Sequence, residues 1–169
     1  MVHAQDVKPV SGVEEASECA QLMLSSEPWI TLQLSPERAV SVLTDPTREV
    51  HAIRDARGVA AFIILDMRGL VAGYIQTLCV RADCRGRGLG SSLIRWAEER
   101  IFRDSPNAFI CVSSFNPGAR RLYERLGFEP VGVLRGFVVA DHDELLLRKT
   151  RGPWADFRKD SERYKDSER

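Results

Sequence analysis

The sequence predicts an α/β fold built on a mixed β-sheet. Segments with the apolar pattern of strands and segments with a helical period are interspersed along the 169 residues. Three of the strand segments follow one another through short turns, which indicates an antiparallel meander. Helices separate the later strands from this meander, and an order of this kind is typical of the α/β class.

Two helices and four strands are expected in the first half of the chain. The first strand is expected at Val7–Val10, and a helix follows at Glu14–Ser25. The second helix, Ser35–Leu43, begins with Ser35-Pro36, because serine caps free N–H groups and proline fits the first helical turn. The antiparallel strands are expected at Glu49–Arg54, Val59–Met67 and Val71–Val80, with turns at Asp55-Ala56-Arg57-Gly58 and Arg68-Gly69.

The second half of the chain is expected to alternate helices with strands. A helix at Leu89–Phe102 places an apolar side chain on one face at every turn, and a short buried strand follows at Ala108–Val112. Asn116-Pro117 begins the last helix by the same cap-and-proline pattern. Gly127 followed by Phe128 ends it, because glycine accepts the left-handed conformation of a Schellman stop. The last two strands are expected at Phe128–Leu134 and Phe137–Leu147.

Composition and charge exclude several classes of function. Apolar residues make up 44% and charged residues 28% of the chain, which is typical of a soluble globular protein. The 24 basic and 24 acidic residues balance, so no overall charge draws the protein to nucleic acid or to an anionic membrane. No apolar run approaches the roughly 20 residues of a membrane span. Any anionic ligand must therefore be bound by local groups.

The cysteines indicate neither a metal site nor a dithiol redox site. They form no C-x-x-C pair and are expected to be reduced thiols. They are Cys19, Cys79, Cys84 and Cys111. The first eight residues lack the basic and apolar segments of a secretory signal, so we expect a cytoplasmic protein.

The length of the chain predicts one domain, which we expect to span residues 1–150. Residues 151–169 differ from it, because they hold six basic and five acidic residues and few apolar ones. We interpret this segment as a solvated C-terminal tail. Its Trp154 and Phe157 are candidates for packing against the domain.

Three alternating glycines follow the third antiparallel strand and precede a helix. In Arg85-Gly86-Arg87-Gly88-Leu89-Gly90-Ser91, the glycines let the backbone turn tightly and bring its N–H groups close to a ligand. The start of the helix adds unpaired donors and the positive end of the helix dipole. The turn is therefore expected to bind a phosphate or pyrophosphate, and Arg85 and Arg87 are candidates for added positive charge.

Two common nucleotide-binding patterns do not fit this turn. The pattern G-x-G-x-x-G would need a third glycine where Ser91 stands, and the pattern G-x-x-x-x-G-K-[ST] is absent. The turn does fit R-x-x-G-x-G, from Arg85 to Gly90, and here the sequence resembles the GNAT superfamily of acetyl-CoA-dependent N-acetyltransferases. Residues Asn116 to Phe128 resemble the second signature of that family, N-x-x-A-x-x-L-Y-x-x-x-G-F.

The resemblance covers about Ala60 to Lys149 and implies a fold and a cosubstrate. The fold would be a six- to seven-stranded mixed sheet, flanked by about four helices, that splays between residues 71–80 and 108–112. Acetyl-CoA would lie in the cleft and donate its acetyl group to a primary amine within a ternary complex. The implied acetyl-CoA-binding residues are Leu78, Cys79, Val80, Arg85, Gly86, Arg87, Gly88, Leu89, Gly90, Ser91, Asn116 and Tyr123.

Tyr123 is the catalytic residue that the resemblance implies. A phenol, with a usual pKa of about 10, can protonate the thiolate of departing coenzyme A. Leu78, Cys79 and Val80 would contribute main chain only, and a bulge between Gln76 and Val80 would leave N–H donors free for the thioester. Cys79 itself is interpreted as a buried apolar thiol.

The sequence does not identify the general base. The two strands that carry a glutamate in other members of the family read Tyr74-Ile75-Gln76-Thr77 and Ile110-Cys111-Val112-Ser113 here, without a carboxylate. Water held by Tyr74, Gln76 or Ser113 is one alternative. The cluster Asp141-His142-Asp143-Glu144 is another, although charges at a turn more often lie at a solvated surface.

Three hypotheses on function stay open at this point. The first is the enzyme, with a protein amine or a small amine as acceptor and with Trp29 as a candidate for the acceptor mouth. The second is a sensor or interaction module that binds acetyl-CoA without turnover, and the third is a binding protein for another nucleotide such as ATP or NAD. Asn116 and Tyr123 favour the enzyme. A homodimer is also left open.

Overall fold

The molecule is built around a seven-stranded sheet with the order β1-β2-β3-β4-β5-β7-β6. A computed structural model describes residues 6–157, and residues 1–5 and 158–169 lie outside the described part. All neighbouring strands are antiparallel except β4 and β5, so the predicted α/β fold with a mixed sheet is confirmed. The elements are β1 (Lys8–Pro9), α1 (Gly12–Leu24), α2 (Pro36–Thr44), β2 (Arg48–Asp55), β3 (Gly58–Asp66), β4 (Tyr74–Val80), the 3-10 helix η2 (Ala82–Cys84), α3 (Leu89–Ile101), β5 (Asn107–Ser113), α4 (Pro117–Arg125), β6 (Glu129–Val139) and β7 (His142–Thr150).

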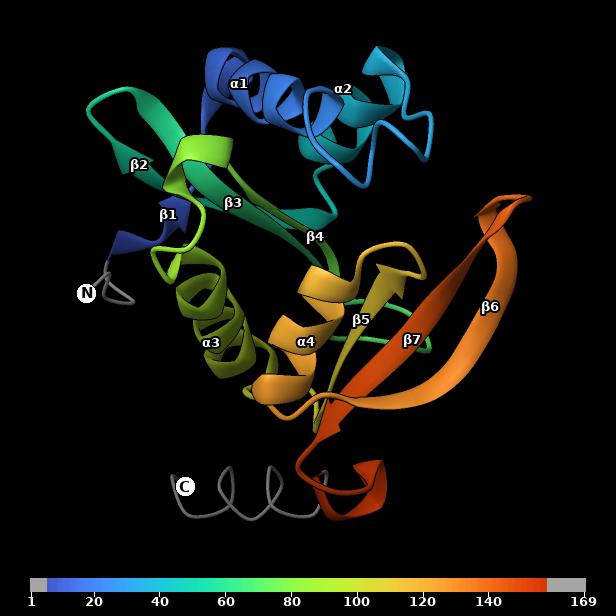
Figure 1. Cartoon of the computed structure of the whole chain (residues 1–169). Helices are drawn as coiled ribbons and strands as arrows, with labels where there is room; N and C mark the ends of the chain where they lie inside the picture. The colour runs from blue at the N-terminus through green and yellow to red at the C-terminus, as the bar shows by residue number, and fades with distance from the viewer. Residues whose placement is uncertain (1–5, 158–169) are drawn as a thin grey trace, which may run out of the picture.

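Helices cover both faces of the sheet, with α1 and α2 on one side of β2–β4 and α3 and α4 on the other (Figure 1). Because side chains of a strand alternate between the faces, β3 contributes to two separate cores. Its Phe62 and Ile64 belong to the core beneath α1 and α2, and Ile63 and Leu65 belong to the core beneath α3. A strand covered on both faces reads as a nearly continuous apolar run, as β3 does from Val59 to Leu65.

The helix α4 begins and ends as the sequence predicts. Asn116 Oδ1 accepts a hydrogen bond from the Ala119 N–H at 3.1 Å and so caps the first turn. Gly127 has a φ of 88°, and the Phe128 N–H donates to the Tyr123 carbonyl at 3.0 Å. These contacts form the predicted Schellman-type stop and fix where the chain leaves the helix.

The sheet opens between β4 and β5. These strands pair only where Tyr74 meets Phe109 and Ile75 meets Ile110. The register between β3 and β4 also shifts at this point, which leaves Gln76 as the extra residue of a bulge. The C-terminal half of β4 therefore diverges from β5, as the predicted splay and bulge require.

The predicted start of the third antiparallel strand is wrong. The strand begins at Tyr74 rather than at Val71, because Gly69 and Gly73 both take positive φ and extend the turn. A side chain at Gly73 would also clash with the backbone, since its Cβ would lie 2.4 Å from the Asn107 carbonyl oxygen.

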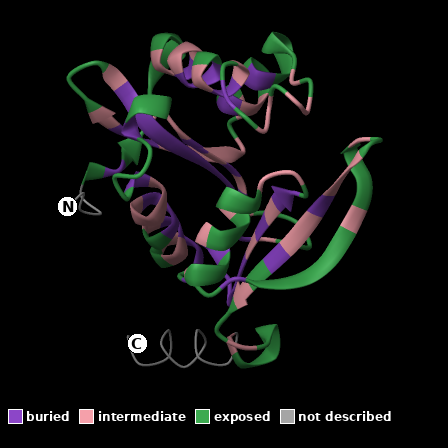
Figure 2. Ribbon diagram, in the orientation of Figure 1, coloured by how far each residue is buried: buried purple, intermediate pink, exposed green. Residues whose placement is uncertain are grey.

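The predicted turn of the last hairpin is also wrong. β6 continues to Val139, so Phe137 belongs to β6 and not to the last strand. Gly136 makes an irregularity inside β6, where its N–H donates to Asp143 Oδ1 at 3.0 Å. The hairpin extends from the helical layers, and most of its edge strand β6 is exposed (Figure 2).

The predicted C-terminal tail is described only as far as Phe157. Within this part, the Arg151 guanidinium lies 4.3 Å from the centroid of the Phe102 ring, and Trp154 packs edge-on against Phe157. The rest of the tail, 158–169, lies outside the described residues. So do residues 1–5, on which the expectation of no secretory signal partly rests. None of the helices within residues 6–157 has the length and apolar content needed to cross a membrane.

Candidate active site

A cavity of about 640 Å³ lies between the end of β4, the glycine turn and the first turns of α3 and α4. Most of the residues predicted to bind acetyl-CoA line it, namely Leu78, Cys79, Val80, Arg85, Gly86, Gly88, Leu89, Gly90, Ser91 and Asn116. The lining also includes residues that were not predicted to bind acetyl-CoA, which are Glu27, Trp29, Cys84, Gly118, Ala119, Leu122 and Arg125. Trp29, considered for the acceptor mouth, therefore faces this larger cavity.

The glycine turn has the backbone conformation that an anion-binding site needs. Gly86 and Gly88 have φ values of 73° and 84°, in the left-handed region that other residues rarely adopt. Gly88 is the N-cap of α3 and offers no side-chain cap, so N–H groups of the first helical turn are left for a ligand. Gly90 lies in this turn, where a Cβ would contact Leu122 and Leu78 at 3.4 and 3.8 Å.

The two arginines of the turn differ in position. The Arg85 Nε–H donates to the Val80 carbonyl at 3.1 Å, so this side chain ties the turn to the end of β4. Arg87 is exposed and does not belong to the cavity lining. Only Arg85 of this pair is therefore placed beside a ligand in the cavity.

Arg81 holds the segment that leads into the turn. Its guanidinium donates to the Val59 carbonyl at 3.1 Å and to Asp83 at 2.8 Å, and it also pairs with Asp55. Asp55 ends β2, Val59 lies on β3 and Asp83 lies on η2, so one side chain connects these three elements. Arg57 makes an additional ion pair with Asp83 but is far more exposed.

Replacing Arg81 by alanine is expected to lower both thermal stability and the affinity for acetyl-CoA. The substitution leaves the Val59 carbonyl and two carboxylates without this donor and frees η2, which positions the glycine turn. Arg57→Ala is the matched control, because its side chain is 66% exposed and such ion pairs contribute little. Thermal unfolding with and without acetyl-CoA measures both effects. Equal behaviour of the two variants would contradict the positioning role of Arg81.

Tyr123 lies on the inner face of α4 and is buried, with only 6% of its surface exposed. Its ring centroid lies 6.3 Å from that of Phe128, and it packs in the core beneath α3 and α4 rather than in the cavity lining. Burial raises the pKa of the Tyr123 phenol above its usual range, so the group keeps its proton at neutral pH.

Cys79 lines the cavity but is 1% exposed, and burial raises the pKa of its thiol to about 12. A thiol of this kind is uncharged at neutral pH and is a poor nucleophile. This agrees with the interpretation of Cys79 as a buried apolar thiol.

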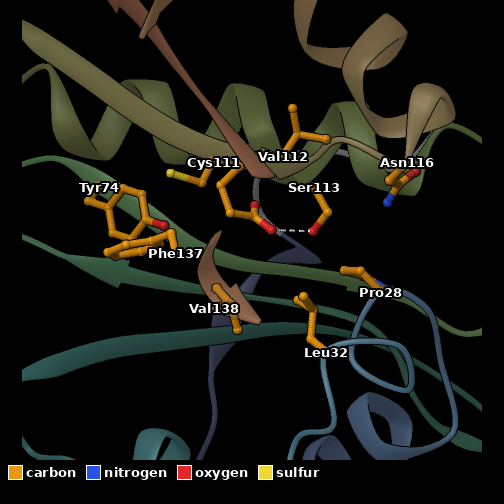
Figure 3. A pocket seen from close by; sticks show the side chains of 10 residues that line it. Pro28, Leu32, Tyr74, Cys111, Val112, Ser113, Asn116, Phe137 and Val138 are labelled. Carbon is orange, nitrogen blue, oxygen red and sulfur yellow. Dashed lines mark hydrogen bonds between the residues drawn. The ribbon is translucent and has the colours of Figure 1, made fainter. Parts of the chain in front are cut away.

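A second cavity, of about 100 Å³, lies beside the first, and Asn116 lines both. The loop between α1 and α2 borders both as well: Glu27 and Trp29 face the larger cavity, and Pro28 and Leu32 face the smaller one. The other side chains of the smaller cavity come from β4, β5 and the last hairpin (Figure 3). They are Tyr74, Cys111, Val112, Ser113, Phe137, Val138 and Glu144.

Glu144 is the carboxylate of this smaller cavity. It is 5% exposed and pairs with Ser113 across the β5–β7 register. The Ser113 hydroxyl donates to Glu144 Oε1 at 2.6 Å, as the dashed line in Figure 3 marks. Burial raises the pKa of the Glu144 carboxyl, and the Ser113 hydrogen bond and nearby His142 partly offset this shift.

The other members of the predicted acidic cluster point to different environments. Asp141 is exposed, and Asp143 accepts the hydrogen bond from Gly136. The His142 ring lies 4.6 Å from the Phe115 ring. Of the four residues considered from the sequence, only Glu144 is therefore brought into a cavity.

Two of the three side chains considered for holding a water lie in the smaller cavity. Tyr74 and Ser113 line it, and Gln76 does not. The Gln76 Oε1 atom is instead buried, without a hydrogen-bond partner in the described structure. Burial raises the pKa values of both Tyr74 and Cys111, which interact with one another, so these groups stay neutral around Glu144.

The acetyltransferase (GNAT) family model matches residues 15–128, which is more than half of the chain. The chain belongs to this family. Two relatives match shorter segments of the chain. An uncharacterised N-acetyltransferase of Methanocaldococcus jannaschii is 28% identical over 103 residues, which cover 53% of this chain and 66% of the relative. An acetyltransferase of Agrobacterium fabrum is 40% identical over 62 residues, 36% of this chain and 44% of that protein.

Solved structures share the GNAT fold across most of the chain. NAA60 of Arabidopsis thaliana, in complex with acetyl-CoA, superimposes with a TM-score of 0.71 at 19% identity and covers 86% of this chain and 97% of that one. An aminoglycoside 6'-N-acetyltransferase complexed with coenzyme A gives a TM-score of 0.70 at 16% identity, over 90% of this chain and 98% of that one. The expected GNAT fold is thus confirmed, with seven strands in the sheet.

In this GNAT protein the two sequence signatures meet at the same cavity. The turn from Arg85 to Ser91 forms one wall, and Asn116 with the first turn of α4 forms another. The third part of the lining is Leu78, Cys79 and Val80 on β4. These residues face the cavity because β4 and β5 splay apart, and not because of a local motif. A strand pattern alone gives no signal for this placement, because it depends on where β5 leaves β4.

Proposed function

We propose that this GNAT protein transfers the acetyl group of acetyl-CoA to a primary amine by direct attack within a ternary complex. The observation that carries the proposal is the glycine turn, whose positive-φ glycines and uncapped helix start open into the 640 Å³ cavity. Backbone N–H groups and the helix dipole at such a position suit a pyrophosphate. The solved relatives named above contain acetyl-CoA or coenzyme A, which supports the same ligand here.

The remainder of acetyl-CoA would extend along β4 towards Asn116. The residues Leu78, Cys79 and Val80 lie on the part of β4 that β5 does not pair, so their main chain is available to the pantetheine arm. A backbone N–H near the Gln76 bulge would stabilise the oxyanion that forms when the amine attacks the thioester. The acceptor would approach from the smaller cavity, because Asn116 lies at the boundary of both.

Tyr123 is the proposed proton donor to the coenzyme A thiolate. Its raised pKa means that the phenol holds its proton at neutral pH, so a proton is present when the departing thiolate forms beside it. The phenol lies in the core on the inner side of α4, so the coenzyme A sulfur would have to reach the inner end of the cavity. The buried Cys79 thiol supports direct transfer, because a neutral thiol does not favour an acetyl-cysteine intermediate.

Release of free coenzyme A thiol from acetyl-CoA in the presence of different amines tests this function. We expect release that depends on both the protein and an amine, together with an acetylated product of matching amount. Saturable binding of acetyl-CoA without thiol release for any amine would instead indicate a sensor. Tighter binding of ATP or NAD than of coenzyme A would contradict the ligand itself.

A further inference from the structure

We infer that Glu144 binds the acceptor ammonium in the smaller cavity and removes its proton, and that the acceptor is a singly charged amine on a compact apolar group. This inference rests on the proposed function and names the substrate class for it. The relevant chemistry is shared by small apolar amines and by the N-terminal amine of a peptide with an apolar first residue.

The first observation is that a carboxylate is buried in a cavity without a cation. Among residues 6–157, Glu144 forms no ion pair with lysine or arginine, and the Ser113 hydroxyl donates a hydrogen bond to its carboxylate. A buried carboxylate without a compensating charge destabilises a fold by desolvation. A ligand that brings one ammonium group would supply the missing charge at this position.

The second observation is the position of Glu144 relative to the proposed acetyl donor. Glu144 and Asn116 line the same small cavity, and Asn116 also lines the cavity of the glycine turn. An amine held at Glu144 would therefore face the larger cavity through the space beside Asn116. The strand β5 has no carboxylate of its own. The β5–β7 register places Glu144 of β7 beside Ser113 of β5 and so supplies one.

The third observation is the apolar character of the remaining wall. Pro28 and Leu32 come from the α1–α2 loop, and Val112, Phe137 and Val138 come from β5 and β6. Tyr74 and Cys111 are neutral, so Glu144 is the one formal charge in the lining that the structure describes. A second ammonium group, as in a polyamine, would meet apolar surface and would lose its hydration without compensation.

The volume agrees with a compact group. A cavity of about 100 Å³ has room for several waters, at roughly 10–15 Å³ for each. This is enough for an amine with a short branched substituent, and the larger body of a peptide acceptor would extend past the exposed Phe137 on β6.

The transfer balances with these groups in place. The ammonium gives one proton to Glu144 and becomes a nucleophile, its nitrogen bonds to the thioester carbon, and the carbon–sulfur bond breaks. A second proton leaves the nitrogen and ends on the coenzyme A sulfur through Tyr123. Glu144 returns its proton to water, so the products are an amide, coenzyme A thiol and one proton.

The test compares Glu144→Gln with the wild type, using isopentylamine, a peptide with leucine at a free N-terminus, and putrescine. We expect the wild type to prefer either monoamine over putrescine by at least about tenfold in kcat/KM. The better of the two monoamines shows whether the acceptor is a small amine or the N-terminal amine of a peptide. Glu144→Gln should lower kcat/KM by about 10²- to 10⁴-fold, the usual contribution of a general base. Asp141→Asn, at the exposed end of the same cluster, should behave as the wild type, and both variants should bind acetyl-CoA normally.

Two further readouts separate a base from a merely structural residue. The deficit of Glu144→Gln should shrink as pH rises, because more of the amine is then already neutral. The neighbouring titratable groups are Tyr74, Cys111 and His142, and His142→Asn removes the contribution of the histidine. Because burial raises the pKa of Glu144, ionisation of this carboxyl destabilises the folded state. Glu144→Gln should therefore be at least as stable as the wild type at pH 8. At acidic pH, where Glu144 is protonated, the stability of the variant relative to the wild type should be lower.

The outcomes distinguish the inference from the function on which it rests. If the wild type acetylates amines but Glu144→Gln stays within about threefold of it, or if putrescine is preferred, this inference is overturned alone. If no amine causes thiol release, the inference and the proposed function are both overturned. Glu144→Asp, which keeps the charge but shortens the side chain, should recover part of the lost rate.

Discussion

Replacing Tyr123 by phenylalanine should lower kcat by about 10²- to 10⁴-fold, the usual contribution of a positioned general acid. The change removes one hydroxyl and keeps the ring that packs near Phe128, so the fold and the affinity for acetyl-CoA should persist. The raised pKa of Tyr123 gives a second expectation: its protonated form is the active one, so it should cause no loss of kcat as pH rises up to the usual phenol pKa of about 10.

Steady-state kinetics and acetyl-CoA binding, measured on the same preparations of Tyr123→Phe, separate the chemical step from binding. A variant with wild-type kcat would contradict the role of Tyr123 as proton donor. A variant that loses acetyl-CoA affinity and thermal stability together would indicate that the hydroxyl supports the core beneath α4.

Replacing Gly90 by phenylalanine should weaken acetyl-CoA binding by at least about 100-fold, or about 2.7 kcal/mol. Gly90 lies in the first turn of α3, and a Cβ there points among Leu78, Val80 and Leu122, all of which line the cavity. A large side chain would therefore occupy the space of the ligand. Its backbone has no positive φ, so the substitution should not strain the turn.

Gly90→Ala is the matched control for this blockade. Its Cβ would make ordinary contacts of 3.4 and 3.8 Å, so we expect a much smaller loss of affinity and an unchanged or slightly raised thermal stability. Isothermal titration of both variants with acetyl-CoA measures the effect. Wild-type affinity in Gly90→Phe would place the ligand outside the 640 Å³ cavity.

Local signals predicted the parts of the site that depend on short segments. Asn116 caps α4, Gly127 ends it, and Gly86 and Gly88 take the left-handed conformations that the turn requires. Each of these features is decided by a few consecutive residues, so the sequence alone was sufficient. The antiparallel meander was predicted for the same reason.

Features that depend on register were not predictable. Glu144 accepts a hydrogen bond from Ser113, which lies 31 residues earlier in the sequence. A shift of one residue between β5 and β7 would turn the Glu144 side chain to the other face of the sheet. The placing of Trp29 and Pro28 against different cavities likewise depends on how one loop crosses both. The wrong hairpin turn arose because Arg135-Gly136 has turn composition but lies within a long, irregular strand.

Direct transfer within a ternary complex is tested most directly by initial rates measured while acetyl-CoA and isopentylamine are varied together. Direct transfer should give intersecting double-reciprocal lines, and no acetylated protein after mixing with acetyl-CoA alone. Parallel lines, together with an acetyl group on a cysteine such as Cys79 or Cys111, would contradict it.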